Sequence, residues 1–454
     1  MPASPARTAA FEILLRVERE SSYASELLHS AACERLSDSD HALATELVMG
    51  VLRWRSRLDD EIATASSQPL SKLDLEVLIA LRLALYQFRH LDRIPQRAAL
   101  NESVELVKRA RKRSAAAFVN AVLRKLSATK PGPACENENQ SPESLARNLA
   151  HPAWLVERWV QAYGFFVARK ICEHDQSIPS TAIRLRTPTA EEVLSQEGIA
   201  PAPGSLLASA RRVQRADITK THSFRTGCIT IQDEGSQLVA ALVGYVTSKG
   251  PSAPARILDC CAAPGGKTLA IADRNPEASI TAVELHLHRA RLLQKLMQTA
   301  HAGERIRVIV GDARRLPISS AFDRVLVDVP CSGTGTLARN PEIKWRLKPS
   351  DLGELHDRQL AILRSALDRA GRSGRVIYST CSLEKEENEE VVEQALTDRR
   401  DFRLLDCRGE LDRLQAAGEL IWPEIATLTC GPYLRTIPGI HPCDGFFAAV
   451  VGRI

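Results

Sequence analysis

Two cysteines stand directly after apolar stretches of the sequence, where a side chain is well placed for chemistry. Cys331 follows residues 325–329, and Cys381 follows residues 375–380. In an open α/β sheet, ligands bind outside the carboxyl ends of the strands. Both thiols are therefore expected at one edge of a sheet, where a thiolate could attack a bound substrate.

A third apolar stretch, residues 255–260, leads into a glycine turn that could hold a cofactor. The turn reads Ala-Ala-Pro-Gly-Gly-Lys-Thr, and acids end this stretch and the next two, at Asp259, Glu284 and Asp312. An acid after the second strand can accept hydrogen bonds from ribose hydroxyls, and Asp312 could reach an adenine edge. Each acid alone is more often a cap or turn residue. The ordered series fits a nucleoside without phosphates, and S-adenosylmethionine is the candidate cofactor.

Two other glycine loops do not match this turn. Gly266-Lys267-Thr268 has the end of a phosphate-binding P-loop, but Cys261 stands where that loop needs its first glycine. The G-x-G-x-x-G pattern of a dinucleotide fold is absent. Neither a nucleotide hydrolase nor a dinucleotide enzyme is favoured.

The elements that must position these residues alternate regularly from about residue 232. A sequence of strands and helices in turn predicts a doubly wound parallel sheet. The predicted strands cover residues 255–260, 279–284, 305–310, 322–329 and 374–380, with a last apolar stretch at 446–451. The predicted helices cover residues 267–274, 286–301, 351–370 and 385–398.

The first part of the chain has a different pattern. Apolar residues recur at helical spacing through residues 5–128, and a polar, proline-rich stretch follows at 131–143. Residues 144–176 again read as helices. Short β-like stretches follow at 181–185 and 228–231.

Positive charge is concentrated in one part of this helical region. Residues 81–130 contain twelve basic and three acidic side chains, a local net charge of +9 in a chain whose total is +5. Such a stripe is typical of a surface that binds a phosphate backbone. A solvated helix face explains the charge equally well.

The composition argues against several classes of protein. The eleven cysteines are an odd number without C-x-x-C pairs, which disfavours a disulfide scaffold and a structural zinc site, so no metal is expected. We find no signal peptide and no apolar run of about 18 residues. We therefore expect a cytoplasmic protein with reduced thiols and no membrane partner.

The catalytic half resembles a known family. Residues 259–268 are similar to the cofactor motif of the Sun/Fmu-type RNA cytosine-C5 methyltransferases, and residues 328–335 and 379–382 are similar to that family's two cysteine motifs. Residues 231–237 and 441–447 resemble its flanking motifs. Two cysteine motifs in this order are highly specific.

The N-terminal helices resemble the NusB RNA-binding domain through residues 101–108 and 118–124. A NusB-like domain joined to this catalytic half is the layout of the family's bacterial small-subunit rRNA methyltransferases. We expect a multi-domain chain with an all-α NusB-like domain, a small α+β middle region and a Rossmann-like methyltransferase domain. The expected parts are the helical RNA-binding domain at 1–130, a linker at 131–143, a middle region at 144–232 and the methyltransferase domain at 233–454.

The resemblance implies a role for each site residue. Cys381 would be the nucleophile, and Cys331 would assist proton removal and release. Asp328 would hydrogen-bond the cytosine amino group and N3, and Lys267 would contact the base from the other side. The implied cofactor-binding residues are Cys261, Ala262, Ala263, Pro264, Gly265, Gly266, Lys267, Glu284, Asp312 and Asp328.

Two positions depart from the family's pattern. Glu284 stands where an aspartate is usual, and Cys260 is an additional thiol that we expect to have a packing role.

The chemistry explains why thiols are needed. C5 of cytosine is a poor nucleophile, and a thiolate that adds at C6 converts C4–C5 into an enamine that can take a methyl group. A free cysteine with a pKa of about 8.5 supplies only a few per cent of thiolate at neutral pH. Because C6 is shielded within a stack, the target base must be unpaired or flipped out.

The expected substrate is 16S (small-subunit) rRNA, bound by a monomer that does not act on DNA. DNA cytosine methyltransferases place their nucleophile in a Pro-Cys motif and do not need the second cysteine, Cys381. The same chemistry on tRNA or large-subunit rRNA stays open. A non-catalytic ribosome-assembly or antitermination factor is the alternative from another class of protein.

Overall fold

The computed structural model divides into two compact units. Unit 1 comprises Met1–Ile178 and Leu337–Arg346, and unit 2 comprises Pro179–Thr336 and Leu347–Ile454. The structure describes residues 3–20, 22–30, 33–129, 141–214, 216–247, 254–319 and 321–454. Most of the linker expected at 131–143 lies outside the described residues.

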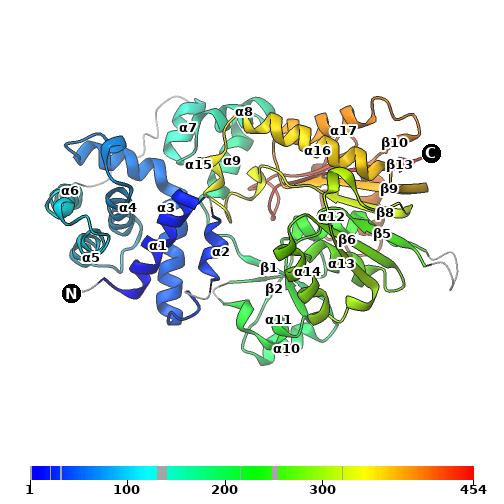
Figure 1. The fold of residues 1–454 in the computed structure, drawn as a ribbon, viewed down its shortest axis with the longest axis horizontal. Helices are drawn as coiled ribbons and strands as arrows, with labels where there is room; N and C mark the ends of the chain where they lie inside the picture. The colour runs from blue at the N-terminus through cyan, green and yellow to red at the C-terminus, as the bar shows by residue number, and fades with distance from the viewer. Residues whose placement is uncertain are drawn as a thin grey trace. The chain divides into compact units, whose positions relative to one another are not determined.

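Unit 1 is built from helices (Figure 1). They are α1 (Pro5–Glu20), α2 (Ala24–Leu28), α3 (Asp38–Ala65), α4 (Leu75–His90), α5 (Gln96–Arg109), α6 (Ala116–Ala128), α7 (Pro142–Asn148), α8 (Ala153–Tyr163), α9 (Phe165–Asp175) and α15 (Ile343–Arg346). The helices expected within 5–128 are confirmed. Apolar side chains of α1, α3, α4 and α6 share one core, as amphipathic helices require. Ser37 caps α3 by accepting a hydrogen bond from the Asp40 amide.

A segment that follows the Cys331 motif in the chain folds into unit 1. Residues 337–346 include α15, and three hydrogen bonds join them to one turn of α3. Arg53 donates to the Ala338 carbonyl (3.0 Å), Lys344 Nζ donates to the Arg53 carbonyl (3.1 Å), and the Trp345 indole donates to the Leu52 carbonyl (2.6 Å). The chain therefore passes from unit 2 into unit 1 and back at this point.

Unit 2 begins with a small antiparallel sheet in the order β2-β3-β1-β4. Its elements are β1 (Thr181–Leu185), α10 (Ala190–Gln196), β2 (Ala202–Pro203), β3 (Ala210–Val213), α11 (His222–Arg225) and β4 (Ile229–Ile231). Ile183, Leu194, Val213 and Ile229 form its own core.

The rest of unit 2 contains a larger mixed sheet in the order β11-β12-β13-β9-β8-β5-β6-β7, with β10 paired to β13. Its strands are β5 (Arg256–Asp259), β6 (Ser279–Glu284), β7 (Ile306–Val310), β8 (Phe322–Asp328), β9 (Ala370–Thr380), β10 (Phe402–Leu405), β11 (Thr429–Cys430), β12 (Tyr433–Thr436) and β13 (Phe446–Arg453). Strands β5 to β9 are parallel. From β5 the next strands in the chain, β6 and β7, lie on one side, and β8 and β9 lie on the other. The strand order therefore reverses between β5 and β8, and this switch point is where such sheets bind ligands.

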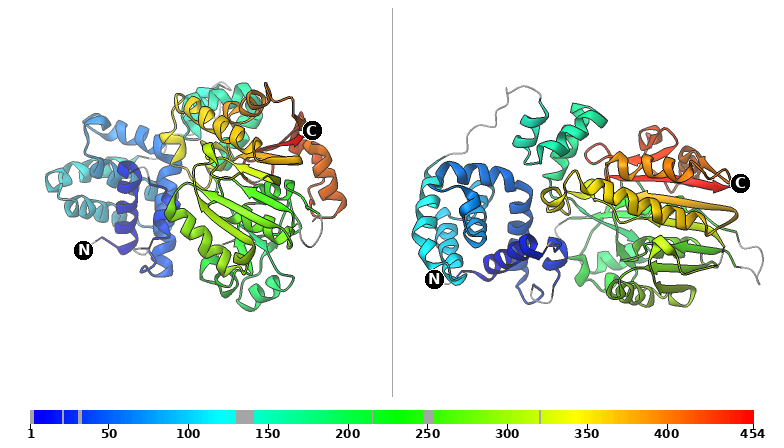
Figure 2. Two further views of the ribbon diagram at one scale, coloured as in Figure 1. Left: turned by 45° about the vertical axis from the view of Figure 1, so that its right-hand side comes forward. Right: turned by 45° about the horizontal axis from the view of Figure 1, so that its top comes forward.

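The strands are apolar on both faces because helices cover both faces (Figure 1, Figure 2). Ile257, Leu326 and Ile377 pack in one core with α12 (Glu234–Leu242), α13 (Gly266–Arg274), α14 (Leu287–Thr299) and α18 (Cys407–Ala416). Their neighbours Leu258 and Val327 pack in the other with α16 (Asp351–Leu367) and α17 (Glu389–Leu396). The doubly wound arrangement expected from the sequence is confirmed.

The alternation of strands and helices predicted a wholly parallel sheet, and this prediction is wrong at one edge of the sheet. β13 runs antiparallel to β9, and β10 and β12 run antiparallel to β13. The strands β10 to β12 are only two to four residues long, and their apolar runs are too short to be recognised in the sequence. No helix in the described ranges is long and apolar enough to cross a membrane.

Candidate active site

Parallel pairing of β8 and β9 places the two predicted catalytic thiols side by side. Asp328 is in register with Ser379, so the loops after the two strands start at the same level. The sulfur atoms of Cys331 and Cys381 are 3.3 Å apart, and the Cys381 amide donates to the Cys331 sulfur over 3.3 Å. Both cysteines are partly exposed.

Asp328 and Lys267, the other two predicted catalytic residues, form an ion pair. Lys267 Nζ in the first turn of α13 lies 2.8 Å from Asp328 Oδ2 at the end of β8. Ser379 donates to the other Asp328 oxygen over 2.8 Å, and the centroid of the Phe446 ring lies 5.1 Å from the ammonium. Both charges are held in place from more than one side.

The environment shifts the pKa of Lys267, Cys331 and Asp259 near the two thiols. Burial is the largest single effect on the pKa of Lys267 and lowers it, but the charge and hydrogen bond of Asp328, together with smaller contributions from neighbouring groups, outweigh burial, so that pKa lies above its ordinary value. The hydrogen bond with Cys381, together with burial, raises the pKa of Cys331 well above that of a free thiol. Burial raises the pKa of Asp259 to about 7, although Thr268 donates to its carboxylate over 2.6 Å.

The glycine turn has the form expected of a cofactor loop. Gly265 has φ of +115°, and a Cβ there would lie 2.6 Å from Leu293, so only glycine suits this position. The next residue, Gly266, begins α13. The Ala262 amide bonds to the Val283 carbonyl over 2.9 Å, which ties the turn to β6. Ala263 and Pro264 complete the turn through a cis peptide bond.

Glu284 ends β6 next to this turn and suits a ribose. Its Oε1 accepts a hydrogen bond from the His286 amide over 2.9 Å. Its Oε2 has no hydrogen-bond partner among the described residues, although the residue is only 5% exposed. A fixed carboxylate with one open oxygen beside a close-approach turn fits the sugar of S-adenosylmethionine.

Asp312 and the neighbouring cysteines are engaged within the protein. Asp312 accepts from the Arg314 amide (2.9 Å) and pairs with its guanidinium (2.7 Å), and this arginine lowers the pKa of Asp312. Burial raises the pKa of Cys261. The Cys260 side chain packs in the core of the sheet. The predicted adenine contact of Asp312 would have to compete with Arg314.

The predicted flanking motifs support the loop of Cys381. Asp233 accepts hydrogen bonds from the amides of Gly235 (2.8 Å) and Asp444 (3.2 Å). The Gly445 amide bonds to the Gly335 carbonyl over 2.7 Å, and the Gly335 amide bonds to the Cys381 carbonyl over 2.9 Å. A Cβ on Gly335 would lie 2.3 Å from the Gly445 oxygen. The flanking motif at 441–447 and the Cys331 motif at 328–335 therefore pack backbone against backbone.

Sequence reasoning missed three residues at this site, Glu387, Ser332 and Ser382. Glu387 is fully buried and accepts hydrogen bonds from both serines, each of which follows one of the cysteines. In the sequence it is one of several acids in residues 384–390. Nothing in the sequence distinguishes a buried acid in this stretch from an acid on a solvated helix face. The serine that follows each cysteine was the available sign, in the sequence, that a buried acceptor lies near both loops.

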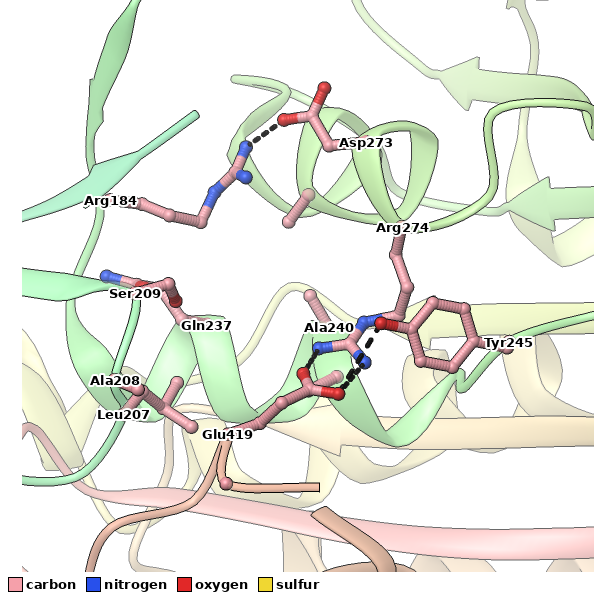
Figure 3. Close-up of a pocket in the computed structure, with 13 residues that line it drawn as sticks. Arg184, Leu207, Ala208, Ser209, Gln237, Ala240, Tyr245, Asp273, Arg274 and Glu419 are labelled. Carbon is pink, nitrogen blue, oxygen red and sulfur yellow. Dashed lines mark hydrogen bonds and ion pairs between the residues drawn. The ribbon is translucent and has the colours of Figure 1, made fainter. Parts of the chain in front are cut away.

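A separate hollow of about 280 Å³ lies in unit 2, between residues of β1, α12 and α13 (Figure 3). It contains none of the predicted site residues. Arg184 pairs with Asp273 over 2.8 Å, and Arg274 donates to Glu419 over 3.0 Å (Figure 3). Among the described residues no group of three or more His, Cys, Asp or Glu side chains could hold a metal ion.

The fold and the site define a Rossmann-like methyltransferase, with a glycine turn after β5 and two thiols in contact after β8 and β9. The model of the 16S rRNA methyltransferase RsmB/F family matches residues 247–451, and that of the NusB family matches residues 4–128. The chain belongs to the RsmB/F family and has a NusB domain at its N-terminus, as the resemblance predicted. S-adenosylmethionine is the methyl donor of this family, so the predicted cofactor is confirmed.

Individual relatives agree with this assignment. A "probable ribosomal RNA small subunit methyltransferase B" of Bacillus subtilis (strain 168) is 35% identical over 98% of both chains. A "ribosomal RNA small subunit methyltransferase B" of Vibrio cholerae serotype O1 is 30% identical over 93% of this chain and 92% of its own. The crystal structure of PH0851 has the same fold, with a TM-score of 0.80, 22% identity and 99% of both chains covered.

Proposed function

We propose that this protein methylates C5 of a cytosine in small-subunit rRNA, through a covalent bond between Cys381 and C6 of the base. The observation that supports this most strongly is the pair of sulfur atoms 3.3 Å apart, at the sheet edge that carries the cofactor turn. The reaction needs one sulfur to attack and a second group to complete the release. The relatives' names point to small-subunit rRNA as the substrate, with the protein acting in the cytoplasm.

Cys381 and Cys331 act in succession. The Cys381 thiolate adds at C6, and the electron pair of the C5–C6 bond moves onto C5, which takes the methyl group. S-adenosylmethionine, when bound, supplies that methyl group as an electrophile. Cys331 then removes the C5 proton, and the electrons of the C5–H bond re-form C5=C6 as Cys381 leaves.

The raised pKa of Cys331 fits this order. Two thiols in contact lose their second proton less readily than their first, as other closely coupled acids do. Cys331 therefore keeps its proton while Cys381 reacts. Once Cys381 is bonded to carbon it carries no charge, and Cys331 can ionise and act as a base.

Asp328 and Lys267 hold the base. Asp328 accepts a hydrogen bond from the cytosine amino group and interacts at N3, which favours addition at C6. Lys267 contacts the base from the other side as a cation that the Asp328 carboxylate keeps charged. Of the predicted cofactor contacts, we assign two to the nucleoside. They are the turn at residues 261–266 and the Glu284 carboxylate.

Two single variants test the order of events. Cys331→Ala should form the adduct but resolve it slowly, so it should accumulate as a denaturant-resistant complex with the rRNA. Cys381→Ala and the double variant should form no such complex and should lose methylation, with S-adenosylmethionine affinity nearly unchanged. A complex formed by Cys381→Ala but not by Cys331→Ala would reverse the assignment.

The substrate is tested by sequencing methylated cytosines in cells with and without the protein. A cytosine of small-subunit rRNA that loses its methyl group in the deletion supports the proposal. Loss from tRNA or large-subunit rRNA alone would move the same chemistry to another RNA. No methyl transfer to any RNA would favour the non-catalytic alternative.

A further inference from the structure

The two cysteine loops lose their strand pairing just before the cysteines. The last strand-like hydrogen bond between them runs from the Val329 amide to the Ser379 carbonyl over 3.0 Å. Beyond it, Pro330 has no amide hydrogen to donate. Beyond this point, side-chain hydrogen bonds help to set the positions of Cys331 and Cys381, together with the Gly335 amide that donates to the Cys381 carbonyl.

One buried carboxylate joins the two loops. Glu387 Oε1 accepts from the Ser332 amide (2.8 Å), and its Oε2 accepts from the hydroxyls of Ser332 and Ser382, the latter over 2.5 Å. The two hydroxyls are 3.0 Å apart, and each belongs to the residue that follows one of the two cysteines. Glu387 thus bonds to both cysteine loops at the same level.

Further groups from the surrounding elements hold Glu387 and the two cysteine loops. Gln359 of α16 is fully buried, and its amide donates both to Glu387 Oε1 (2.8 Å) and to the Pro330 carbonyl (3.0 Å). The Tyr378 hydroxyl donates to the Glu387 carbonyl over 2.6 Å. Asn388 donates to the Ser382 carbonyl over 2.9 Å. The carboxylate and the two loops are therefore tied to α16 and β9 as well as to each other.

We propose that Glu387 is a positioning residue for the methyl-transfer reaction, because it holds the loops of Cys331 and Cys381 at one separation. The argument for its role in methylation rests on the proposed function. The described donors to its carboxylate are neutral amide and hydroxyl groups. An acid in this position serves as an acceptor of four hydrogen bonds, and it does not touch the substrate.

The chemistry of the side chain explains why an acid is needed. An ionised carboxylate has about four acceptor sites and no donor. Glutamine has the same shape but replaces one oxygen with a donor, so two donors of the network would face an NH₂ group or have to turn. Aspartate keeps the charge but is one methylene too short to reach both loops. Both substitutions should loosen the loops in different ways.

The test compares Glu387→Gln and Glu387→Asp with Glu390→Gln, a matched control. Glu390 lies three residues further along the chain, is partly exposed, and pairs with Lys385. We expect single-turnover methylation to slow by about 100-fold in both Glu387 variants, since a misplacement near 1 Å can cost that much. The RNA and S-adenosylmethionine dissociation constants should stay within about twofold, as should all parameters of the control.

A second measurement needs no RNA and reports the loops directly. Iodoacetamide labelling is followed by mass spectrometry for each cysteine peptide in the full-length protein. We expect Cys331 to react about tenfold faster in the Glu387 variants because its loop opens more often. Cys260 and Cys407, both buried in the two cores, should stay unlabelled and so show that the fold is intact.

Each outcome decides the proposal. Unchanged methylation and unchanged Cys331 labelling in the Glu387 variants would overturn it. If Cys260 and Cys407 also become labelled, the Glu387 variants have unfolded, and the Ser382→Ala variant is used instead. In that variant, faster Cys331 labelling with Cys407 still protected supports the proposal. Unchanged Cys331 labelling in that variant rejects it. If wild-type protein methylates no cytosine, the proposed function fails while the labelling result still decides the role of Glu387.

Discussion

The nucleoside end of the site depends on two acids that the structure treats differently. Glu284 has one oxygen bonded to the His286 amide and the other open, whereas both oxygens of Asp312 accept from Arg314. A carboxylate already paired with a guanidinium gains little from a further donor, because its charge is largely compensated. Glu284 is therefore the stronger candidate for a ligand contact.

This difference makes a prediction at the scale of single residues. Glu284→Gln should weaken S-adenosylmethionine binding by about tenfold, because a charge-assisted hydrogen bond to a ribose hydroxyl is worth roughly 1.5–3 kcal/mol. Asp312→Asn should change the affinity by less than about threefold, which corresponds to less than ~0.7 kcal/mol. Isothermal titration calorimetry measures both. The reverse ranking would show that Arg314 releases Asp312 to the adenine when the cofactor binds.

The helices of the basic region show that sequence charge is not the same as surface charge. Arg82 is buried and pairs with Asp59 over 2.7 Å, and Arg89 pairs with Glu61 over 2.8 Å. Lys108, Arg109 and Lys112 also pair with acids. Five exposed arginines have no partner among the described residues: Arg93, Arg97, Arg111, Arg113 and Arg124.

If these helices bind RNA, the unpaired arginines should carry most of the effect. Replacing Arg97, Arg113 and Arg124 with glutamine should weaken RNA binding. It should also reduce the slope of log K against log salt by roughly 0.7–0.9 for each phosphate group that the protein no longer neutralises. Fluorescence anisotropy at several salt concentrations measures the slope.

The control neutralises paired arginines of α1. Arg16 and Arg19 pair with Glu20 and Glu76, and their glutamine variants should leave the slope nearly unchanged. An unchanged slope in the Arg97, Arg113 and Arg124 variant would assign the stripe to a solvated helix face.

At the scale of the whole molecule, the chain joins its two units through more than one crossing. Residues 337–346 follow the Cys331 loop in the sequence but belong to unit 1, where Lys344 is fully buried. Burial lowers the pKa of Lys344 to about 7, and attraction from Asp175 only partly offsets this. Protonation of Lys344 therefore favours the unfolded chain and lowers the free energy of unfolding.

The pH dependence of stability should show this group. Between pH 10.5 and 7 the unfolded chain binds a proton at Lys344 that the folded chain does not bind, so the free energy of unfolding should fall as pH is lowered. The contribution to the slope is at most about 1.4 kcal/mol per pH unit, and it should vanish below about pH 7, where both states are protonated.

Urea denaturation at about pH 7, 8.5 and 10 tests this with Lys344→Met, across the range in which only the unfolded chain is protonated. The variant should have a flatter pH dependence over this range than the wild type. Lys348→Met, at an exposed position nearby, should follow the wild type. Equal slopes for Lys344→Met and wild type would show that Lys344 ionises normally in the folded protein.

Much of the site was predictable from contiguous residues. The glycine turn, the cysteines after the strands and the acid after β6 are each encoded within a short stretch, because strand ends and tight turns depend on local apolar pattern and on glycine. The adjacency of Cys331 and Cys381 followed from one further rule, that chemistry gathers at the carboxyl edge of a parallel sheet. The turn and the strand ends rest on local interactions, whereas the adjacency of the two cysteines also needs the parallel pairing of β8 with β9.

Other features were decided only by the tertiary structure. Glu387 and the partly exposed Glu386 and Glu390 have the same side chain, and only the packing of α16 and β9 buries Glu387. In the same way, folding pairs Arg82 with Asp59 and draws residues 337–346 into unit 1. The reason is physical: burial and ion pairing depend on groups distant in the chain, whereas strand ends and turns depend on neighbours in the sequence.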